Sequence, residues 1–60
     1  MIYERVTFVE AECVKMTEKE FIDHHIDTCW PDRDKKTRRR MLADAHRRMK
    51  AAVGGGTAGE

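Results

Sequence analysis

The sequence predicts a mostly α-helical protein in which one N-terminal β-strand is followed by an antiparallel hairpin of two helices, completed by dimerisation. Three observations support this fold class. The side chains of residues 2–9 fall on two alternating faces, as in a β-strand. A capping box at Thr17 marks the start of a helix, and apolar residues at helical spacing after Pro31 indicate another. The 60 residues make one domain at most, predicted at residues 1–53 and followed by a flexible glycine-rich tail at 54–60.

The predicted strand, Ile2–Val9, is rich in β-branched and aromatic residues. With a period of two, its inner face holds Ile2, Val6 and Phe8. Its outward face holds Tyr3, Arg5 and Thr7, whose side chains can all form hydrogen bonds. Residues 1–53 contain none of the glycine-containing pairs that mark a tight hairpin. The strand is therefore expected to pair with another copy of the chain, with a second protein, or with residues 11–15 folding back, while residues 10–15 fit a continued strand or a loop.

The first helix is predicted to begin at Thr17. Thr17 and Glu20 have the spacing of a capping box, and Met16 and Phe21 have that of a hydrophobic staple. An apolar stripe follows at helical spacing: Phe21, Ile22, His25, Ile26 and Cys29. Pro31 ends this helix because it disfavours the α conformation at Trp30, whose indole is expected to close the core between the helices.

The second helix is predicted from about Lys35 to about Val53, with Asp32 or Asp34 as its cap and Gly54 as its C-terminal stop. Its apolar stripe is Met41, Leu42, Ala45, Met49, Ala52 and Val53. Five cationic side chains fall on the opposite face: Lys36, Arg39, Arg40, Arg47 and Lys50. Contacts are expected to join Ile22, Ile26 and Trp30 to Met41, Ala45 and Met49.

Charge is divided unevenly along the chain. Residues 1–30 hold three basic and seven acidic side chains, a balance of −4, whereas residues 31–60 hold nine basic and four acidic, a balance of +5. The basic half predicts an acidic partner, although attraction between the two halves, or a solvated face that keeps the protein soluble, explains the charge equally well.

Four residues could hold a metal ion. His25 and Cys29 lie four apart on one predicted helical face, and Cys13 and His46 could complete a tetrahedral zinc site. The spacing matches no standard finger, and core packing is the preferred interpretation for His25 and Cys29, which lie on the apolar stripe. No cofactor is predicted. A core this small leaves no room for a substrate cleft beside Cys29 and His25, so an enzyme is not expected.

The sequence therefore predicts a small non-enzymatic binding or regulatory protein. The strand–helix–helix order is similar, in topology alone, to that of the ribbon-helix-helix dimers that bind DNA, which implies paired strands in the major groove. The first hypothesis is a dimeric nucleic-acid-binding regulator that uses Tyr3, Arg5 and Thr7 with the basic second helix. The alternative is an adaptor or inhibitor that engages an acidic protein surface. With no signal peptide and no membrane span in the sequence, a cytoplasmic location and no membrane partner are expected.

Overall fold

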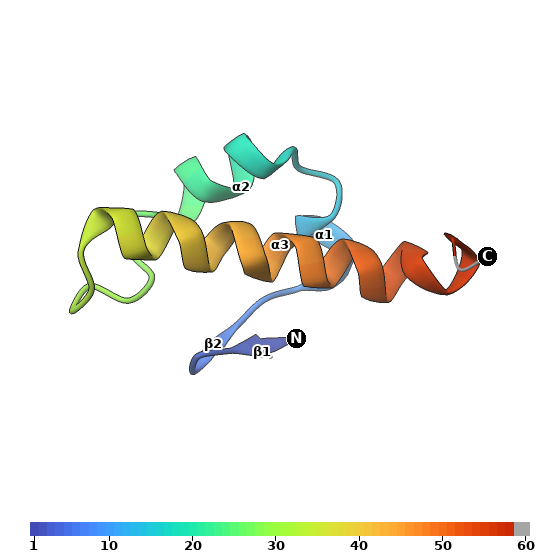
Figure 1. The fold of residues 1–60 in the computed structure, drawn as a ribbon, viewed down its shortest axis with the longest axis horizontal. Helices are drawn as coiled ribbons and strands as arrows, with labels where there is room; N and C mark the ends of the chain where they lie inside the picture. The colour runs from blue at the N-terminus through green and yellow to red at the C-terminus, as the bar shows by residue number, and fades with distance from the viewer. Residues whose placement is uncertain (59–60) are drawn as a thin grey trace.

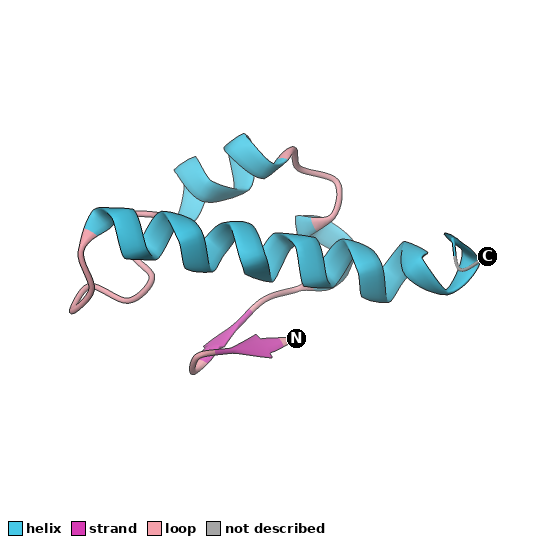
Figure 2. Ribbon diagram, in the orientation of Figure 1, coloured by secondary structure: helices cyan, strands magenta, loops and turns pink. Residues whose placement is uncertain are grey.

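A long C-terminal helix runs the length of the molecule, with a shorter helix above it and a two-stranded ribbon below it in the view of Figure 1. The computed structural model describes residues 1–58. The elements in chain order are β1 (Ile2–Tyr3), β2 (Val6–Thr7), α1 (Glu10–Cys13), α2 (Glu18–His25) and α3 (Lys35–Ala58). Figure 2 shows the helical majority and the small two-stranded ribbon at the N-terminus. The predicted mostly helical class is confirmed, but with three helices in place of two and two strands in place of one.

The N-terminal strand is not continuous, which corrects the prediction for residues 2–9. β1 and β2 pair antiparallel within the chain, with Ile2 opposite Thr7 and Tyr3 opposite Val6. Glu4 and Arg5 form the two-residue turn, at φ values of 47° and 71°. Two consecutive positive φ angles are what a type I′ turn requires, and neither residue is the Asn or Gly that announces one. The hairpin had no recognisable turn signal, and its internal pairing removes the argument that the strand needs a second copy of the chain.

The turn also changes which side chains of the ribbon face inward. Residues directly opposite each other share a face, so Tyr3 and Val6 lie on one side and Ile2 and Thr7 on the other. Tyr3 and Val6 are half-buried, whereas Ile2 is 75% exposed. The predicted outward placement of Tyr3 and inward placement of Ile2 are therefore wrong, because a two-residue turn breaks the simple alternation.

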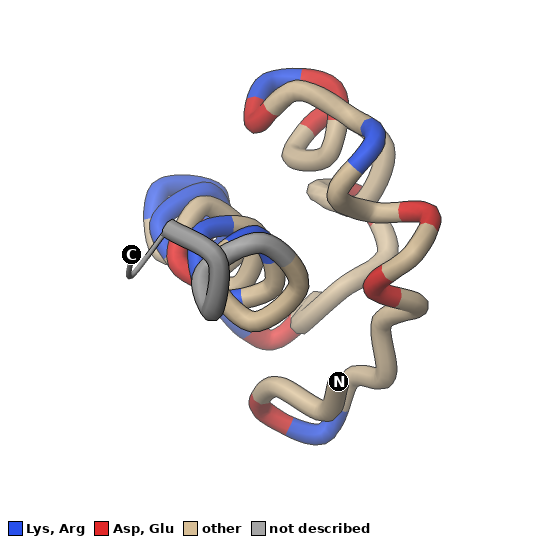
Figure 3. The backbone as a smooth tube through the Cα atoms, turned by 90° about the vertical axis from the view of Figure 1, so that its right-hand side faces the viewer, with Lys and Arg blue, Asp and Glu red and all other residues tan. Residues whose placement is uncertain are grey.

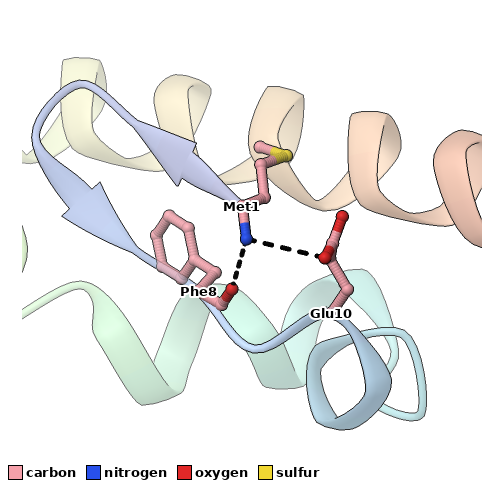
Figure 4. Close-up of polar contacts among 3 residues, drawn as sticks. All are labelled: Met1, Phe8 and Glu10. Carbon is pink, nitrogen blue, oxygen red and sulfur yellow. Dashed lines mark hydrogen bonds and ion pairs between the residues drawn. The ribbon is translucent and has the colours of Figure 1, made fainter.

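Backbone and terminal groups hold the ribbon closed and join it to α1. The Phe8 N–H donates to the Met1 carbonyl, and the Met1 ammonium donates to the Phe8 carbonyl, each over 2.7 Å. The same ammonium lies 3.6 Å from a Glu10 carboxylate oxygen (Figure 4). The indole N–H of Trp30 donates to the carbonyl of Glu4 over 2.7 Å, so the segment before Pro31 supports the strained turn.

Residues 10–13 form a short helix, α1, where a strand or loop was predicted. Glu10 and Glu12 lie in its first turn, where the exposed backbone N–H groups favour negative charge, and Ala11 between them is the best helix former. Packing then selects the helix, because it buries Cys13 in the core. The sequence signal for this helix was the run Glu-Ala-Glu, which is too short to distinguish a helix from a loop.

The predicted start of α2 is confirmed, including its cap. The Thr17 hydroxyl accepts from the Glu20 N–H at 3.1 Å, and the Glu20 carboxylate accepts from the Thr17 N–H at 2.9 Å. Regular helix ends at His25, earlier than the end just before Trp30 that Pro31 predicted, and a further turn leads to Trp30 at φ 50°. Pro31 disfavours the right-handed α conformation at Trp30, so the helix does not continue through this residue.

Figure 1 shows α2 and α3 running in opposite directions. Asp34 accepts from the Thr37 N–H at 2.9 Å, as a cap does, and the Arg38 guanidinium donates to the Ile26 carbonyl at the end of α2 over 2.7 Å. α3 continues through Gly54 to Ala58, beyond the predicted end at about Val53. Residues 59–60 of the predicted tail lie outside the described residues, and the division into a domain and a tail stays a prediction.

The core lies between α3 and the remaining elements, and nine residues form its buried cluster: Phe8, Cys13, Phe21, Ile26, Cys29, Trp30, Leu42, Ala45 and Met49. Ile22 and Met41 are only partly buried, and Val53 is 56% exposed, so the predicted stripes extend further than the real core. Trp30 packs edge-on against Tyr3 and Phe8, which places it against the ribbon as well as the helices. None of the helices within residues 1–58 combines the length and apolarity of a membrane span.

Candidate functional site

The exposed side of α3 carries a row of cations that we call the basic face: Lys36, Arg39, Arg40, Arg47 and Lys50. All five side chains are exposed. At 100° per residue they fall within about one third of the helix circumference, and at 1.5 Å per residue they extend over about 21 Å of its length. The core residues Leu42, Ala45 and Met49 lie on the other side of the same helix. Burying α3 by its apolar stripe therefore forces these cations toward solvent or a partner.

Few carboxylates neutralise the basic face. Among residues 1–53, the ion pairs join the Met1 ammonium to Glu10, Arg33 to Asp32 and Arg48 to Asp44, and none involves a member of the basic face. Figure 3, a view along α3, shows the basic residues concentrated on that helix and most acidic residues on the other elements. The charge asymmetry along the sequence is thus an asymmetry in space, with a cationic side whose five members make no ion pair among residues 1–53.

A hollow of about 340 Å³ opens in the middle of this surface. Its lining comes from β1 and from two turns of α3: Tyr3, Arg40, Met41, Ala43, Asp44 and Arg47. The Tyr3 ring, Met41 and Ala43 supply apolar surface, while Arg40 and Arg47 supply positive charge. The hollow therefore combines an apolar lining with two exposed guanidinium groups, a combination suited to a ligand that is partly flat and apolar and partly anionic.

A polar network fixes the Asp44 side of the hollow. The Tyr3 hydroxyl donates to Asp44 Oδ2 over 2.7 Å, and Arg48 Nε lies 3.1 Å from the same oxygen. The Arg48 guanidinium also lies over the Tyr3 ring, 5.6 Å from its centroid. Burial, followed by the hydrogen bond and negative charge of Asp44, raises the pKa of the Tyr3 phenol. The phenol thus remains a hydrogen-bond donor at neutral pH, and Arg48 offsets the charge that Asp44 would present to an anion.

The remaining predicted binding residues are not all gathered at this site. Arg39 lines a separate hollow beside α2, together with Glu18, Lys19, Ile22 and Asp23, so nearby carboxylates weaken its attraction for an anion. Thr7 lines another hollow with His24 and Glu12, and Arg5 lies exposed in the ribbon turn. Of the three ribbon residues, the structure places Tyr3 in the central hollow with Arg40 and Arg47.

Sequence reasoning missed Asp44 and Arg48 as members of this surface. Their four-residue spacing is a recognisable helical ion-pair signal. Their contact with Tyr3, which lies 41 residues from Asp44, had no signal in the sequence because the reversal at Glu4 and Arg5 brings the phenol to α3.

The four candidate metal ligands do not form a metal site. No cluster of three or more His, Cys, Asp or Glu suited to a metal occurs among the described residues. His46 is buried and its Nε2 donates to the Met16 carbonyl over 2.9 Å, while His25 Nδ1 donates to the Phe21 carbonyl over 2.9 Å. Burial raises the pKa of both the Cys13 and Cys29 thiols, which opposes the thiolate form that binds zinc. These groups pack the core.

Comparison with protein-family models, with curated proteins and with solved structures finds no match to this chain.

Proposed function

We propose that this chain is a small non-enzymatic nucleic-acid-binding protein that contacts phosphates through the basic face of α3. The single observation that carries the proposal is the row of five exposed cations over about 21 Å of one helix, none of them in an ion pair among residues 1–53. Evenly spread phosphates complement such a row, and each contact releases counterions from the nucleic acid.

The chemistry of the basic face favours a polyanion over an acidic protein. Protein interfaces draw much of their affinity from buried aromatic and aliphatic side chains. The large exposed hydrophobics among residues 1–53 are Ile2, Val9 and Val53, and none belongs to the basic face. At 100° per residue, Val53 lies about 100–120° around α3 from Lys36 and Arg47 and about 60° from Lys50, so it borders the basic face at one end. The surface thus offers charge with little apolar area, which suits a phosphate backbone.

Fluorescence anisotropy with labelled single-stranded and duplex oligonucleotides tests the proposal. With five phosphate contacts, affinity for a duplex is expected to fall about 500-fold between roughly 50 and 200 mM salt. Arg40→Ala together with Arg47→Ala leaves three contacts, so the expected fall is about 40-fold over the same range. Both side chains are exposed, and the melting temperature should barely change.

A matched control removes two cations outside α3. Lys15→Ala together with Arg33→Ala changes the net charge by the same amount and also acts on exposed side chains. This variant should retain most of the wild-type affinity and salt dependence. No binding of any oligonucleotide at low salt would end the nucleic-acid proposal, and binding of an acidic protein by the same face would then support the adaptor alternative. Equal losses in the two double variants would show that net charge, not the basic face, governs binding.

A homodimer is a separate proposal. Both outer edges of the two-stranded ribbon lack a strand neighbour among the described residues, and Ile2 and Val9 beside them are 75% and 58% exposed. A second copy that covered these side chains would double the number of cations available to one nucleic acid. Light scattering that finds only the 7.0 kDa species at high micromolar concentration would refute it. The cytoplasmic location also stays a prediction.

A further inference from the structure

We infer that the hollow beside Tyr3 takes one unpaired base of a single-stranded nucleic acid, whose flanking phosphates Arg40 and Arg47 hold. The inference rests on the proposed function and specifies its ligand. The hollow measures about 340 Å³, at the lower end of the range of about 300–1,000 Å³ in which small molecules bind.

The lining matches the parts of a nucleotide. Tyr3, Met41 and Ala43 give apolar surface for the faces of a base, and aromatic and apolar contacts of this kind do not depend on which base is present. Asp44 contributes a carboxylate that accepts hydrogen bonds, and every base carries N–H donors on its pairing edge. Both contacts that fix Asp44 fall on Oδ2.

The two arginines lie where phosphates on either side of that base would pass. Arg40 and Arg47 are seven residues apart on nearly the same side of α3, about 10.5 Å along the helix axis, and both line the hollow. Lys36 and Lys50 extend the charge by about one turn beyond each of them. A strand that follows α3 can therefore contact cations along its length while one base enters the hollow.

A duplex cannot use the hollow in this way. Its bases are stacked and their pairing edges are occupied, so it presents phosphates to the basic face and leaves the apolar lining without a ligand. Single strands, in contrast, can turn a base out toward protein side chains. The hollow thus predicts a preference for single strands that the charge of α3 alone would not give.

The direct test compares two single strands that differ only in their bases. Wild-type protein is titrated with an oligothymidylate of about 12 nucleotides and with an abasic strand of the same length and charge. The abasic strand is expected to bind about tenfold more weakly, as loss of one base contact predicts. Equal affinity for the two strands would overturn this inference while leaving the proposed function intact. Binding of neither strand, with a duplex still bound, would overturn the inference alone, and binding of no oligonucleotide would overturn both.

A variant that fills the hollow gives an independent test. Ala43→Leu enlarges a side chain of the lining and keeps every cation, so it should lose the preference for thymidylate over the abasic strand. Ala51→Leu makes the same substitution at an exposed position of α3 that does not line the hollow, and it should behave as wild type. If folded Ala43→Leu still prefers oligothymidylate over the abasic strand, the base binds elsewhere and the inference is wrong. If this variant does not fold, the comparison of the two strands with wild-type protein decides whether a base is bound.

Discussion

The turn between β1 and β2 provides a sharp test of the backbone geometry. Glu4 and Arg5 have φ values of 47° and 71°, and each left-handed non-glycine residue costs roughly 1–2 kcal/mol. Both side chains are exposed, so replacing them removes little packing. Glu4→Asn together with Arg5→Gly creates the Asn-Gly pair that type I′ turns favour. The greater freedom of glycine in the unfolded chain offsets about 0.5–1 kcal/mol of this, which leaves an expected gain of about 1–3.5 kcal/mol.

The assay is thermal and urea unfolding, followed by far-UV circular dichroism and by the fluorescence of Trp30, whose indole contacts the turn. For a domain of this size, each kcal/mol gained raises the melting temperature by roughly 8 °C. Glu4→Gln with Arg5→Lys is the matched control, because it also replaces both exposed side chains but keeps their length and their lack of preference for positive φ, and it should leave stability unchanged. A double Asn-Gly variant no more stable than wild type would refute the assigned turn.

Three further predictions concern the core, the cap and the phenol. Ile26→Ala should lower the free energy of unfolding by about 2–4 kcal/mol, since the side chain is 8% exposed, and a loss below about 0.5 kcal/mol in urea titration would remove it from the core. Thr17→Ala should cost about 1 kcal/mol through the lost cap, and an unchanged melting temperature would contradict the capping geometry. The fold raises the Tyr3 pKa above its ordinary value of about 10, so its stabilisation is complete below that pH and is lost as pH rises through the folded pKa. Tyr3→Phe should therefore reduce the alkaline loss of stability, and identical pH profiles for both proteins would contradict this.

Local signals predicted the helices well. The capping box at Thr17 and Glu20 is present, and α3 begins at Lys35 as expected, because these features depend on neighbouring residues. The apolar spacing also identified most of the buried helical side chains, and Phe21, Leu42 and Met49 are the largest of those that are fully buried.

The ribbon was mispredicted because its turn is decided by tertiary contacts. Glu4 and Arg5 have no preference for positive φ, and the alternating pattern of residues 2–9 fits an unbroken strand. The Trp30 indole, 26 residues from Glu4, supports the turn, and the Tyr3–Asp44 hydrogen bond holds the ribbon to α3. Such long-range contacts cannot be inferred from periodicity.

The candidate site was only partly predictable, because one part of it depends on helical spacing and the other on long-range contacts. The cationic row on α3 follows from helical spacing alone, whereas the hollow requires Tyr3 to lie against Met41, Ala43 and Asp44. That contact depends on the unexpected reversal of the chain. The proposed phosphate contacts thus arise from sequence, and the proposed base contact arises from the fold.

Mapping amide chemical shifts in a ¹⁵N-labelled sample tests the central claim most directly. On titration with a short oligothymidylate at about 50 mM salt, where even a few phosphate contacts give measurable affinity, we expect the largest changes between Lys36 and Lys50 on α3 and at Tyr3. Residues of α1 and of the acidic side of α2 should shift little. Absence of changes along α3, or changes centred on α1 and α2, would contradict the assignment of the basic face as the nucleic-acid-binding surface.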